Sequence, residues 1–285
     1  MLPEIPECRA TGSTAAIFAD IKSCLQVPMV NLIYRHLATV PAGLEWAWCS
    51  IRPVVVDGTV PSAADRLTRV LRDGGLLPAL GVSSAIGRLT ADPDAANQVK
   101  RILDSYNVAN PQNLIIVLSL LELLTSERQP NALLPVAEFN AGSPSRGDGS
   151  RDSALPPMID PSDIAAPIVE LIASVGVGRG GHEEVIIPSL YRHLARWPQF
   201  LVEELDRLNS PSSMRRIDEA DAEITTRAHA AASHIVHGCS SGIALFKPPA
   251  PTVRGRLVGQ LRNFADGTIS RMIVMGELLA SVTRP

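Results

Sequence analysis

The sequence lacks the features that mark several large classes of protein. Its 285 residues carry a formal net charge of −3 and no run of lysine and arginine, which argues against a nucleic-acid-binding surface. Four cysteines are scattered without a C-x-x-C pair. We therefore expect reduced thiols in a cytoplasmic protein rather than a zinc site or a disulfide framework. The N-terminus has no basic segment followed by an apolar one, so no signal peptide is expected.

Long apolar runs and alternating patterns are missing as well. The longest apolar stretch, Leu114 to Leu121, contains one serine and is far shorter than a membrane span, so we expect no membrane association. No segment alternates polar and apolar residues as a half-buried strand does. The glycine-rich run 176–181 lacks a Gly-Lys-Ser/Thr ending, so no nucleotide or other cofactor is predicted. Apolar residues recur at helical spacings, and we predict an all-α protein.

The sequence does contain an internal repeat. Tyr-Arg-His-Leu-Ala occurs at 34–38 and again at 191–195, and in each copy two residues separate the alanine from a proline. A second pair of similar segments, 121–126 and 276–281, follows in the same order at nearly the same spacing. Two such pairs predict two homologous helical halves that face each other across a pseudo-two-fold axis, as an intrachain pseudo-dimer.

The predicted halves are separated by a segment of different composition. We place the first half at 1–126, a linker rich in proline, glycine and serine at 127–162, and the second half at 163–285. In the first half, Asn107, Asn110 and Pro111 predict a turn between a helix at 94–106 and another at 112–126. The second half is predicted to end with one long helix at 255–281.

A series of short blocks runs through nearly the whole chain. In order, they are Asp20-Ile21-x-x-x-Leu25-x-Val27-Pro28, Leu37-Ala38-Thr39-x-Pro41, Ala47-Trp48, Tyr106-Asn107-x-x-Asn110-Pro111, Leu194-Ala195-x-Trp197-Pro198 and Ala265-Asp266-x-Thr268-Ile269-Ser270. The series resembles the group I 2-haloacid dehalogenases, all-helical enzymes that hydrolyse both enantiomers. The resemblance implies a pseudo-dimer built from one chain, with a buried site between its halves.

The catalytic residues implied by this resemblance are only partly present. In the family, an aspartate of the second half activates water, and an asparagine of the first half helps to place that water. The asparagine corresponds to Asn110, but the aspartate position, directly after Ser189, is Leu190. Because leucine accepts no proton, ordinary hydrolysis is not expected. Glu184 is the candidate for a relocated base, and the alternative is a carboxylate that caps a helix start.

Several other positions expected to contact the substrate differ from the family. The residues expected to contact the substrate are Met29, Leu32, Asn113, Ser189, Leu190, Gln260, Asn263 and Arg271, and all but Ser189 and Asn263 depart from the family. Amides replace two pocket tyrosines, and Arg271 replaces an apolar residue. Arg271 could hold a sulfate, phosphate or carboxylate through a bidentate contact, or it could lie solvated at a helix edge. The changes favour a larger polar or anionic substrate.

The remaining candidates for chemistry are weaker. His36 and His193 occupy equivalent repeat positions, so we interpret both as structural. The thiols of Cys24 and Cys239 are not expected to be nucleophiles. His229, His234 and His237 have spacings of five and three without a nearby carboxylate, and a metal site is not predicted.

Three functions remain open from the sequence. The first is an enzyme that displaces sulfate or halide at a saturated carbon, with an amine or hydroxyl of the substrate as nucleophile. Closure of an aziridine ring in antibiotic biosynthesis would be such a reaction. The second is a non-catalytic subunit that binds or stabilises a partner, and the third is a hydrolase with a relocated base. The substrate is expected to be anionic or to carry an amine, and a homo-oligomer or a second subunit stays open.

Overall fold

The computed structural model describes residues 3–73, 75, 89, 91–126, 155–176, 187–238 and 249–283. Within these ranges every regular element is a helix, which confirms the all-α class. The elements are η1 (Glu7–Arg9), α1 (Gly12–Leu25), α2 (Leu32–Leu37), α3 (Gly43–Val56), α4 (Thr59–Asp73), α6 (Pro93–Thr125), η2 (Pro161–Asp163), α7 (Ala166–Ser174), α8 (Ser189–Leu194), α9 (Pro198–Leu208), α10 (Pro211–Gly238), α11 (Pro251–Ala265) and α12 (Thr268–Thr283).

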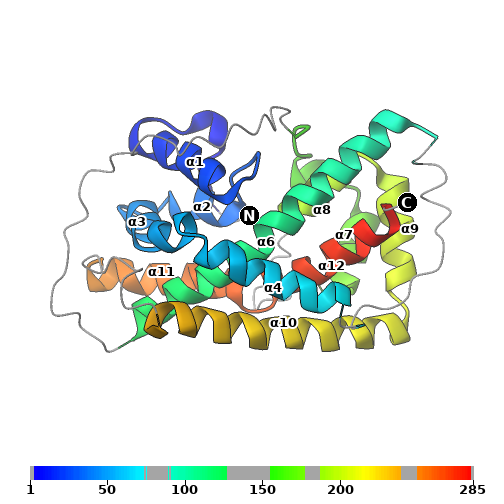
Figure 1. Ribbon diagram of the computed structural model, residues 1–285. Coiled ribbons are helices and arrows are strands. Elements are labelled where there is room, and N and C mark those ends of the chain that lie inside the picture. Colours follow the sequence, from blue (N-terminus) through cyan, green and yellow to red (C-terminus); the bar gives the residue numbers. More distant parts are fainter. Residues whose placement is uncertain are drawn as a thin grey trace.

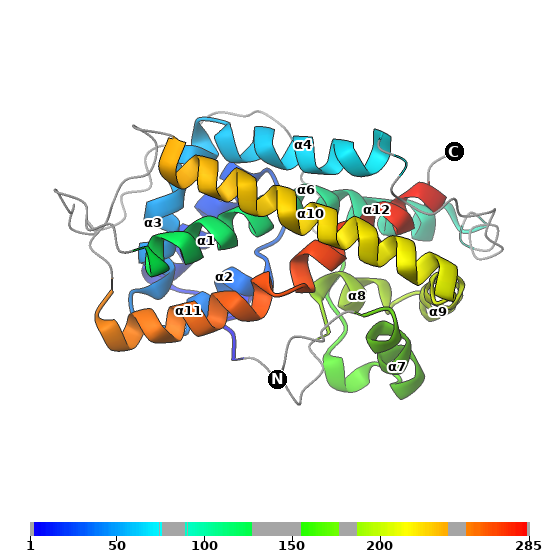
Figure 2. The ribbon, with the colours of Figure 1, turned by 90° about the horizontal axis from the view of Figure 1, so that it is seen from below.

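The long helix α6 forms the centre of the molecule. The helices α4, α10, α11 and α12 pack against it, while α1 to α3 gather at one end and α7 to α9 at the other (Figures 1 and 2). By length and composition α6 is long and apolar enough to cross a membrane. However, 72% of its most apolar 18-residue stretch is buried inside the molecule. A helix that is apolar on most faces and covered by its neighbours is a core helix.

The predicted turn at Asn107–Pro111 is wrong, because α6 continues through these residues as one helix. The side chain of Asp92 caps its start by accepting the backbone N–H groups of Asp94 and Ala95 at 3.1 Å, and Pro93 occupies the first helical position. A proline inside a helix costs about 3 kcal/mol. Burial of nearly every residue from 106 to 120 against neighbouring helices outweighs that local preference.

The last predicted helix, 255–281, is instead two helices. The chain bends at Gly267, whose φ of +89° suits glycine, and α12 then packs closely on α6. The Asn107 side-chain amide donates to the Gly276 carbonyl at 3.1 Å. A Cβ at position 276 would lie 2.2 Å from Asn107 Oδ1, so a larger residue there would displace the Asn107 amide from this position.

The repeat has a structural counterpart in α2 and α8, which carry its two copies and are both six residues long. In front of each, an extended segment bonds to the equivalent arginine. The Ile5 N–H donates to the Arg35 carbonyl at 3.0 Å, and the Ile159 N–H donates to the Arg192 carbonyl at 3.0 Å. Matching backbone contacts of this kind support a common origin of the halves.

Equivalent glutamates also reach across between the predicted halves. Glu122 of α6 contacts His237 of α10, and Glu277 of α12 pairs with Arg72 of α4. Each glutamate therefore joins the last long helix of one half to a helix of the other. These contacts support the pseudo-two-fold arrangement, which stays a prediction. The boundaries at 126 and 163 also stay predictions, since 127–154 lie outside the described residues.

Candidate functional site

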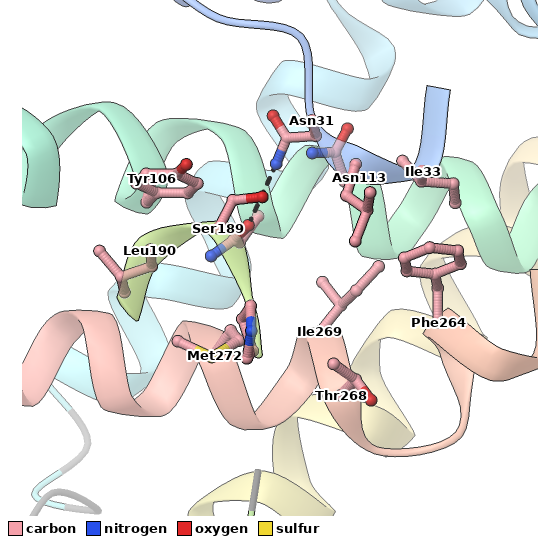
Figure 3. Close-up of a pocket in the computed structure, with 13 residues that line it drawn as sticks. Asn31, Ile33, Tyr106, Asn113, Ser189, Leu190, Phe264, Thr268, Ile269 and Met272 are labelled. Carbon is pink, nitrogen blue, oxygen red and sulfur yellow. Dashed lines mark hydrogen bonds between the residues drawn. The ribbon is translucent and has the colours of Figure 1, made fainter. Parts of the chain in front are cut away.

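A cavity of about 60 Å³ lies where α2, α6, α8, α11 and α12 meet (Figure 3). The residues directly before both copies of the repeat, 31–33 and 188–190, contribute to its wall. The described residues that line it are Asn31, Leu32, Ile33, Tyr106, Asn110, Asn113, Pro188, Ser189, Leu190, Phe264, Thr268, Ile269 and Met272. A single water needs about 10–15 Å³ measured in this way. The cavity therefore holds a few waters or a small substrate, and the larger substrate expected from the sequence does not fit this volume.

Amide groups form the polar side of the cavity. The Asn31 Nδ2 donates to Asn110 Oδ1 at 3.4 Å, and the Tyr34 hydroxyl donates to Asn113 Oδ1 at 2.8 Å. Within the described part of the chain, Asn31 Oδ1 and Asn113 Nδ2 have no hydrogen-bond partner. Buried polar atoms normally have partners. One acceptor and one donor therefore remain for a molecule in the cavity.

No carboxylate lines this cavity among the described residues. The side chain of Leu190 fills the expected acid position and is 1% exposed. The buried carboxylates Asp20, Glu204 and Glu277 lie elsewhere, and each pairs with an arginine. A carboxylate held by arginine is a weak proton acceptor, because the ion pair stabilises its charged form. None of the three supplies the missing base.

Among the described residues of the wall, the ionisable side chain is the phenol of Tyr106. Its hydroxyl lies 2.9 Å from Nδ1 of His193, which is buried behind it. Burial lowers the pKa of His193 to about 4, although hydrogen bonds to the backbone of Ser189 and Pro156 act in the opposite direction. Burial raises the pKa of Tyr106. At neutral pH both groups are therefore uncharged, and a protonated phenol faces a neutral imidazole.

Sequence reasoning missed Tyr106 and interpreted His193 as structural. The signal was present, because Tyr106, Asn110 and Asn113 have the spacing i, i+4 and i+7, which puts all three on one face of a helix. The wrong prediction of a turn at 107–111 hid this spacing. In the observed helix α6 all three residues line the cavity.

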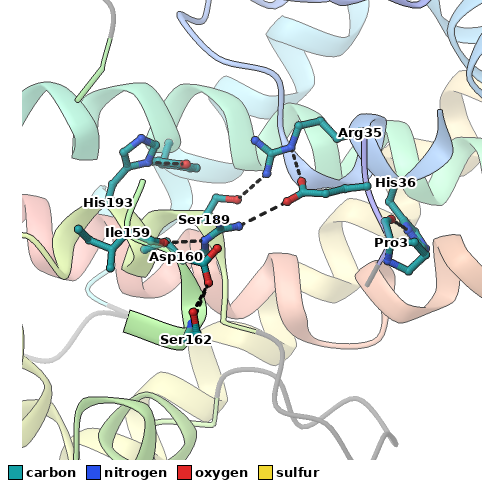
Figure 4. Close-up of polar contacts among 11 residues, drawn as sticks. Pro3, Arg35, His36, Ile159, Asp160, Ser162, Ser189 and His193 are labelled. Carbon is teal, nitrogen blue, oxygen red and sulfur yellow. Dashed lines mark hydrogen bonds and ion pairs between the residues drawn. The ribbon is translucent and has the colours of Figure 1, made fainter. Parts of the chain in front are cut away.

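Two arginines lie beside the cavity and share one carboxylate (Figure 4). Arg35 Nε is 2.7 Å from Glu4 Oε2, and Arg192 Nη1 is 3.7 Å from Glu4 Oε1. An Arg35 Nη2 also reaches the hydroxyl of Ser189, at 3.5 Å. The Arg35 guanidinium thus places a positive charge next to Ser189, which favours an anion there.

Of the residues predicted from the sequence, some meet at the cavity and others do not. The cavity brings together Leu32, Asn110, Asn113, Ser189 and Leu190. Met29 is buried in the core, and neither Gln260 nor Asn263 of α11 belongs to the described lining. Glu184 and Cys239 lie outside the described residues.

Arg271 is also placed away from the cavity, which corrects its predicted role as the anion-binding residue. Its guanidinium donates to the Val175 carbonyl at 3.0 Å and to Asp218 Oδ1 at 2.6 Å, and it packs over Gly176. Its neighbours Ile269 and Met272 line the cavity. A residue between these two positions on a helix points in another direction, so Arg271 joins α12 to α7 and α10 instead.

The other candidates show no arrangement suited to catalysis. Burial raises the pKa of Cys24 to about 11, which keeps the thiol protonated and unreactive. His237 contacts Glu122, and His229 and His234 lie along α10. Among the described residues no group of three histidine, cysteine or acidic side chains could hold a metal ion.

The fold is that of the all-helical 2-haloacid dehalogenases. No protein-family model matches the chain. A 2-haloacid dehalogenase described as configuration-inverting, from Alcaligenes xylosoxydans xylosoxydans, is 27% identical over 279 residues, or 94% of this chain and 90% of that protein. The crystal structure of a D-2-haloacid dehalogenase mutant matches this chain with a TM-score of 0.75 and 18% identity. The structure of a D-2-haloacid dehalogenase mutant in complex with D-2-CPA matches it with a TM-score of 0.73 and 18% identity. Both matches cover 100% of this chain and 96% of the other.

These comparisons confirm the resemblance predicted from the sequence. The chain is a divergent relative of the 2-haloacid dehalogenases, and the likeness extends over almost its full length. The two structural matches are similar in fold at low identity. They describe the scaffold rather than the chemistry of this cavity.

Proposed function

We propose that this protein displaces a leaving group, halide or sulfate, at a saturated carbon held in the cavity, without water activated by a carboxylate. The observation that carries the proposal is a cavity that keeps Asn110 but has Leu190 where an acid is expected. The relative named 2-haloacid dehalogenase supports the halide-displacing class. A site without a carboxylate base can still align a nucleophile with a carbon and stabilise a departing anion.

The nucleophile in this proposal belongs to the substrate itself. An amine or hydroxyl next to the carbon attacks it, a ring closes, and the leaving group departs with the electron pair of its bond. Aziridine formation in natural-product biosynthesis is the example we favour, and the enzyme would act in the cytoplasm. Leu190 disfavours the competing hydrolysis, because the described lining then has no carboxylate to deprotonate water.

The volume of the cavity and the positive charge beside it agree with this substrate class. Arg35 reaches the Ser189 hydroxyl at 3.5 Å, so the departing anion meets a positive charge near Ser189. A volume of about 60 Å³ suits the reacting part of a small molecule. Asn31 Oδ1 and Asn113 Nδ2 are free to hold polar atoms of that molecule within the described part of the site.

Two alternatives remain, and each has an observation in its favour. A small, largely apolar cavity suits a non-catalytic subunit that kept the fold and stabilises a partner or a second copy. A buried imidazole close to the cavity suits a hydrolase whose base has moved from the aspartate position. Glu184, the other candidate for such a base, lies outside the described residues.

The test offers the purified protein 2-chloropropionate, a vicinal chloroamine and a vicinal amino sulfate in water enriched in ¹⁸O. Chloride and sulfate are measured by ion chromatography and products by mass spectrometry, against a blank without protein. We expect anion release above the blank from an amino compound, with a ring product free of ¹⁸O. A hydroxy acid carrying ¹⁸O would favour the hydrolase, and no release from any compound would favour the non-catalytic subunit.

A matched pair of variants sharpens this test. Leu190→Asp restores an acid at the position after Ser189 and should introduce ¹⁸O into the product, with a lower yield of ring. The asparagine of Leu190→Asn has nearly the same shape as aspartate but accepts no proton at neutral pH. This variant should therefore not introduce ¹⁸O into the product. Equal labelling by both variants, or by neither, would contradict the role given to position 190.

A further inference from the structure

We propose that Tyr106 accepts the proton released by the attacking nucleophile and passes its own proton to His193. The inference rests on the proposed function and names the group that replaces the missing acid. Tyr106 is then a catalytic residue, because its phenol lines the cavity. His193 is a positioning residue that acts through it, because its ring lies behind the phenol with its Nδ1 2.9 Å from the hydroxyl.

The position of Tyr106 suits a group that meets the substrate. It lies one helical turn before Asn110 on α6, beside Ser189 and Leu190 at the start of α8 (Figure 3). Its hydroxyl is buried, so exchange of its proton with solvent is slow compared with transfer to a neighbour in contact. Leu190, at the expected acid position, lines the same cavity.

The position of His193 suits a proton acceptor. Its side chain is 4% exposed, and Figure 4 shows the imidazole directed toward a hydroxyl on α6. Burial keeps the ring neutral, with a pKa of about 4, close to that of an ordinary aspartate. The imidazole therefore has an unprotonated nitrogen that can accept a proton at neutral pH. Nearby Arg192 and Arg35 also lower this pKa, so the ring releases its proton again after each turnover.

The proposed step balances in atoms and charge. The lone pair of the nucleophile forms the new bond to carbon, and the bond between carbon and the leaving group breaks, with its electrons going to the departing anion. The proton of the nucleophile moves to Oη of Tyr106 while the phenolic proton moves to Nδ1 of His193. The products are a closed ring, an anion, a neutral tyrosine and an imidazolium ion, which charge-balances the anion until both are discharged to solvent.

The chain offers matched controls for both residues. His36 occupies the equivalent repeat position, is as buried as His193, and its Nδ1 contacts the Pro3 carbonyl at 2.5 Å instead of a tyrosine. Tyr191 is a fully buried tyrosine whose hydroxyl has no partner among the described residues. Neither residue lines the cavity. Replacement of His36 or Tyr191 therefore shows the effect of removing a buried imidazole or hydroxyl away from the cavity.

The activity experiment compares Tyr106→Phe and His193→Gln with His36→Gln and Tyr191→Phe on the amino compound that the wild type converts. We expect the first two to lower kcat by about 100-fold, as loss of a proton acceptor does, with KM changed by less than about threefold. Between about pH 6 and 8 their kcat should rise with pH, since the nucleophile must lose its proton to solvent, whereas wild-type kcat stays flat. Rates within about threefold of the wild type would overturn the relay and leave the proposed function standing.

A second measurement needs no substrate and separates the two proposals. Long-range ¹H–¹⁵N spectra of protein with labelled histidine report which ring nitrogen carries the proton. We expect His193 to be neutral with Nδ1 unprotonated at neutral pH, and this signal to shift in Tyr106→Phe but not in Tyr191→Phe. A proton on Nδ1 would overturn the relay even if no compound were converted, while absence of turnover with the expected tautomer would count against the proposed function alone.

Discussion

The two copies of the repeated pentapeptide show how one local sequence serves two purposes. In α2, the imidazole of His36 contacts the carbonyl of Pro3, a backbone group of the N-terminal segment. In α8, the imidazole of His193 contacts the phenol of Tyr106, which lines the cavity. Both rings are almost completely buried. The first contact fixes a chain segment, whereas the second brings a proton acceptor to a cavity.

For the tyrosines it is the first copy, and not the second, that contacts a residue of the cavity. The Tyr34 hydroxyl donates to Asn113 beside the cavity, whereas the Tyr191 hydroxyl is buried with no partner in the described part of the chain. The copies therefore share a backbone and divide the polar contacts between them. Local sequence determines the helix and its burial, and the residue on the facing helix determines the chemistry. The difference between the copies can be tested residue by residue.

The arginines of the repeat should give the largest difference. Arg35 is 4% exposed and 2.7 Å from Glu4, whereas Arg192 is 12% exposed and 3.7 Å from the same carboxylate. Removal of one partner from a buried ion pair costs about 3–5 kcal/mol, so Arg35→Ala should lower the free energy of unfolding by about that amount. Arg192→Ala should cost about 1 kcal/mol, the value of an ordinary hydrogen bond.

Urea unfolding of the two variants and the wild type measures this difference. Glu4→Gln serves as the control, since it should reduce the cost of Arg35→Ala in the double variant. Equal losses in the two arginine variants would show that their different burial has no energetic consequence.

The pH dependence of stability should single out His193. An unfolded histidine has a pKa of about 6.5, and the folded value is about 4, so the unfolded chain binds more protons between these values. The stability associated with His193 is complete above about pH 6.5 and is lost as the pH falls toward 4, by about 3 kcal/mol in total. Below pH 4 both states bind the proton and no further loss occurs from this group.

The measurement is the free energy of unfolding between about pH 4 and 7 for the wild type and His193→Gln. The glutamine variant should lose less stability over this range, because it has no ring to protonate in the unfolded state. The other titrating groups are the same in both proteins and cancel in the difference. Parallel curves would show that burial does not suppress protonation of this ring.

Much of the fold could be predicted from the sequence because its signals are local. Helical periodicity gave the class, and the repeat gave the pairing of α2 with α8. The errors fell where tertiary burial outweighs local preference. Pro111 and its flanking asparagines are typical of a turn, yet α6 runs through them inside the core. Nothing local at Gly267 distinguished a break between helices from a tolerated glycine.

The site could be predicted only as far as the resemblance reached. Asn110, Asn113, Ser189 and Leu190 line the cavity, as the resemblance implied. Arg271 does not, because its role depends on Asp218 of another helix. Contacts between residues that are distant in sequence are not encoded in any single segment. The pairing of Tyr106 with His193 is of this kind.

Substitution of the repeat tyrosines should change the free energy of unfolding least. The two variants should still differ clearly in whether stability is lost. Tyr34→Phe removes the donor to Asn113 Oδ1 and leaves a buried amide with neither polar atom paired, which costs about 1–3 kcal/mol. Tyr191→Phe removes a buried hydroxyl that has no partner in the described residues, so its stability should be unchanged or slightly higher. Urea unfolding of both variants gives the comparison, and Tyr34→Phe with Asn113→Leu tests whether the unpaired amide causes the loss, since the double variant should recover part of it. A loss in Tyr191→Phe equal to that in Tyr34→Phe would mean that both hydroxyls are paired in solution, and the contrast between the two copies would then rest on their histidines and arginines alone.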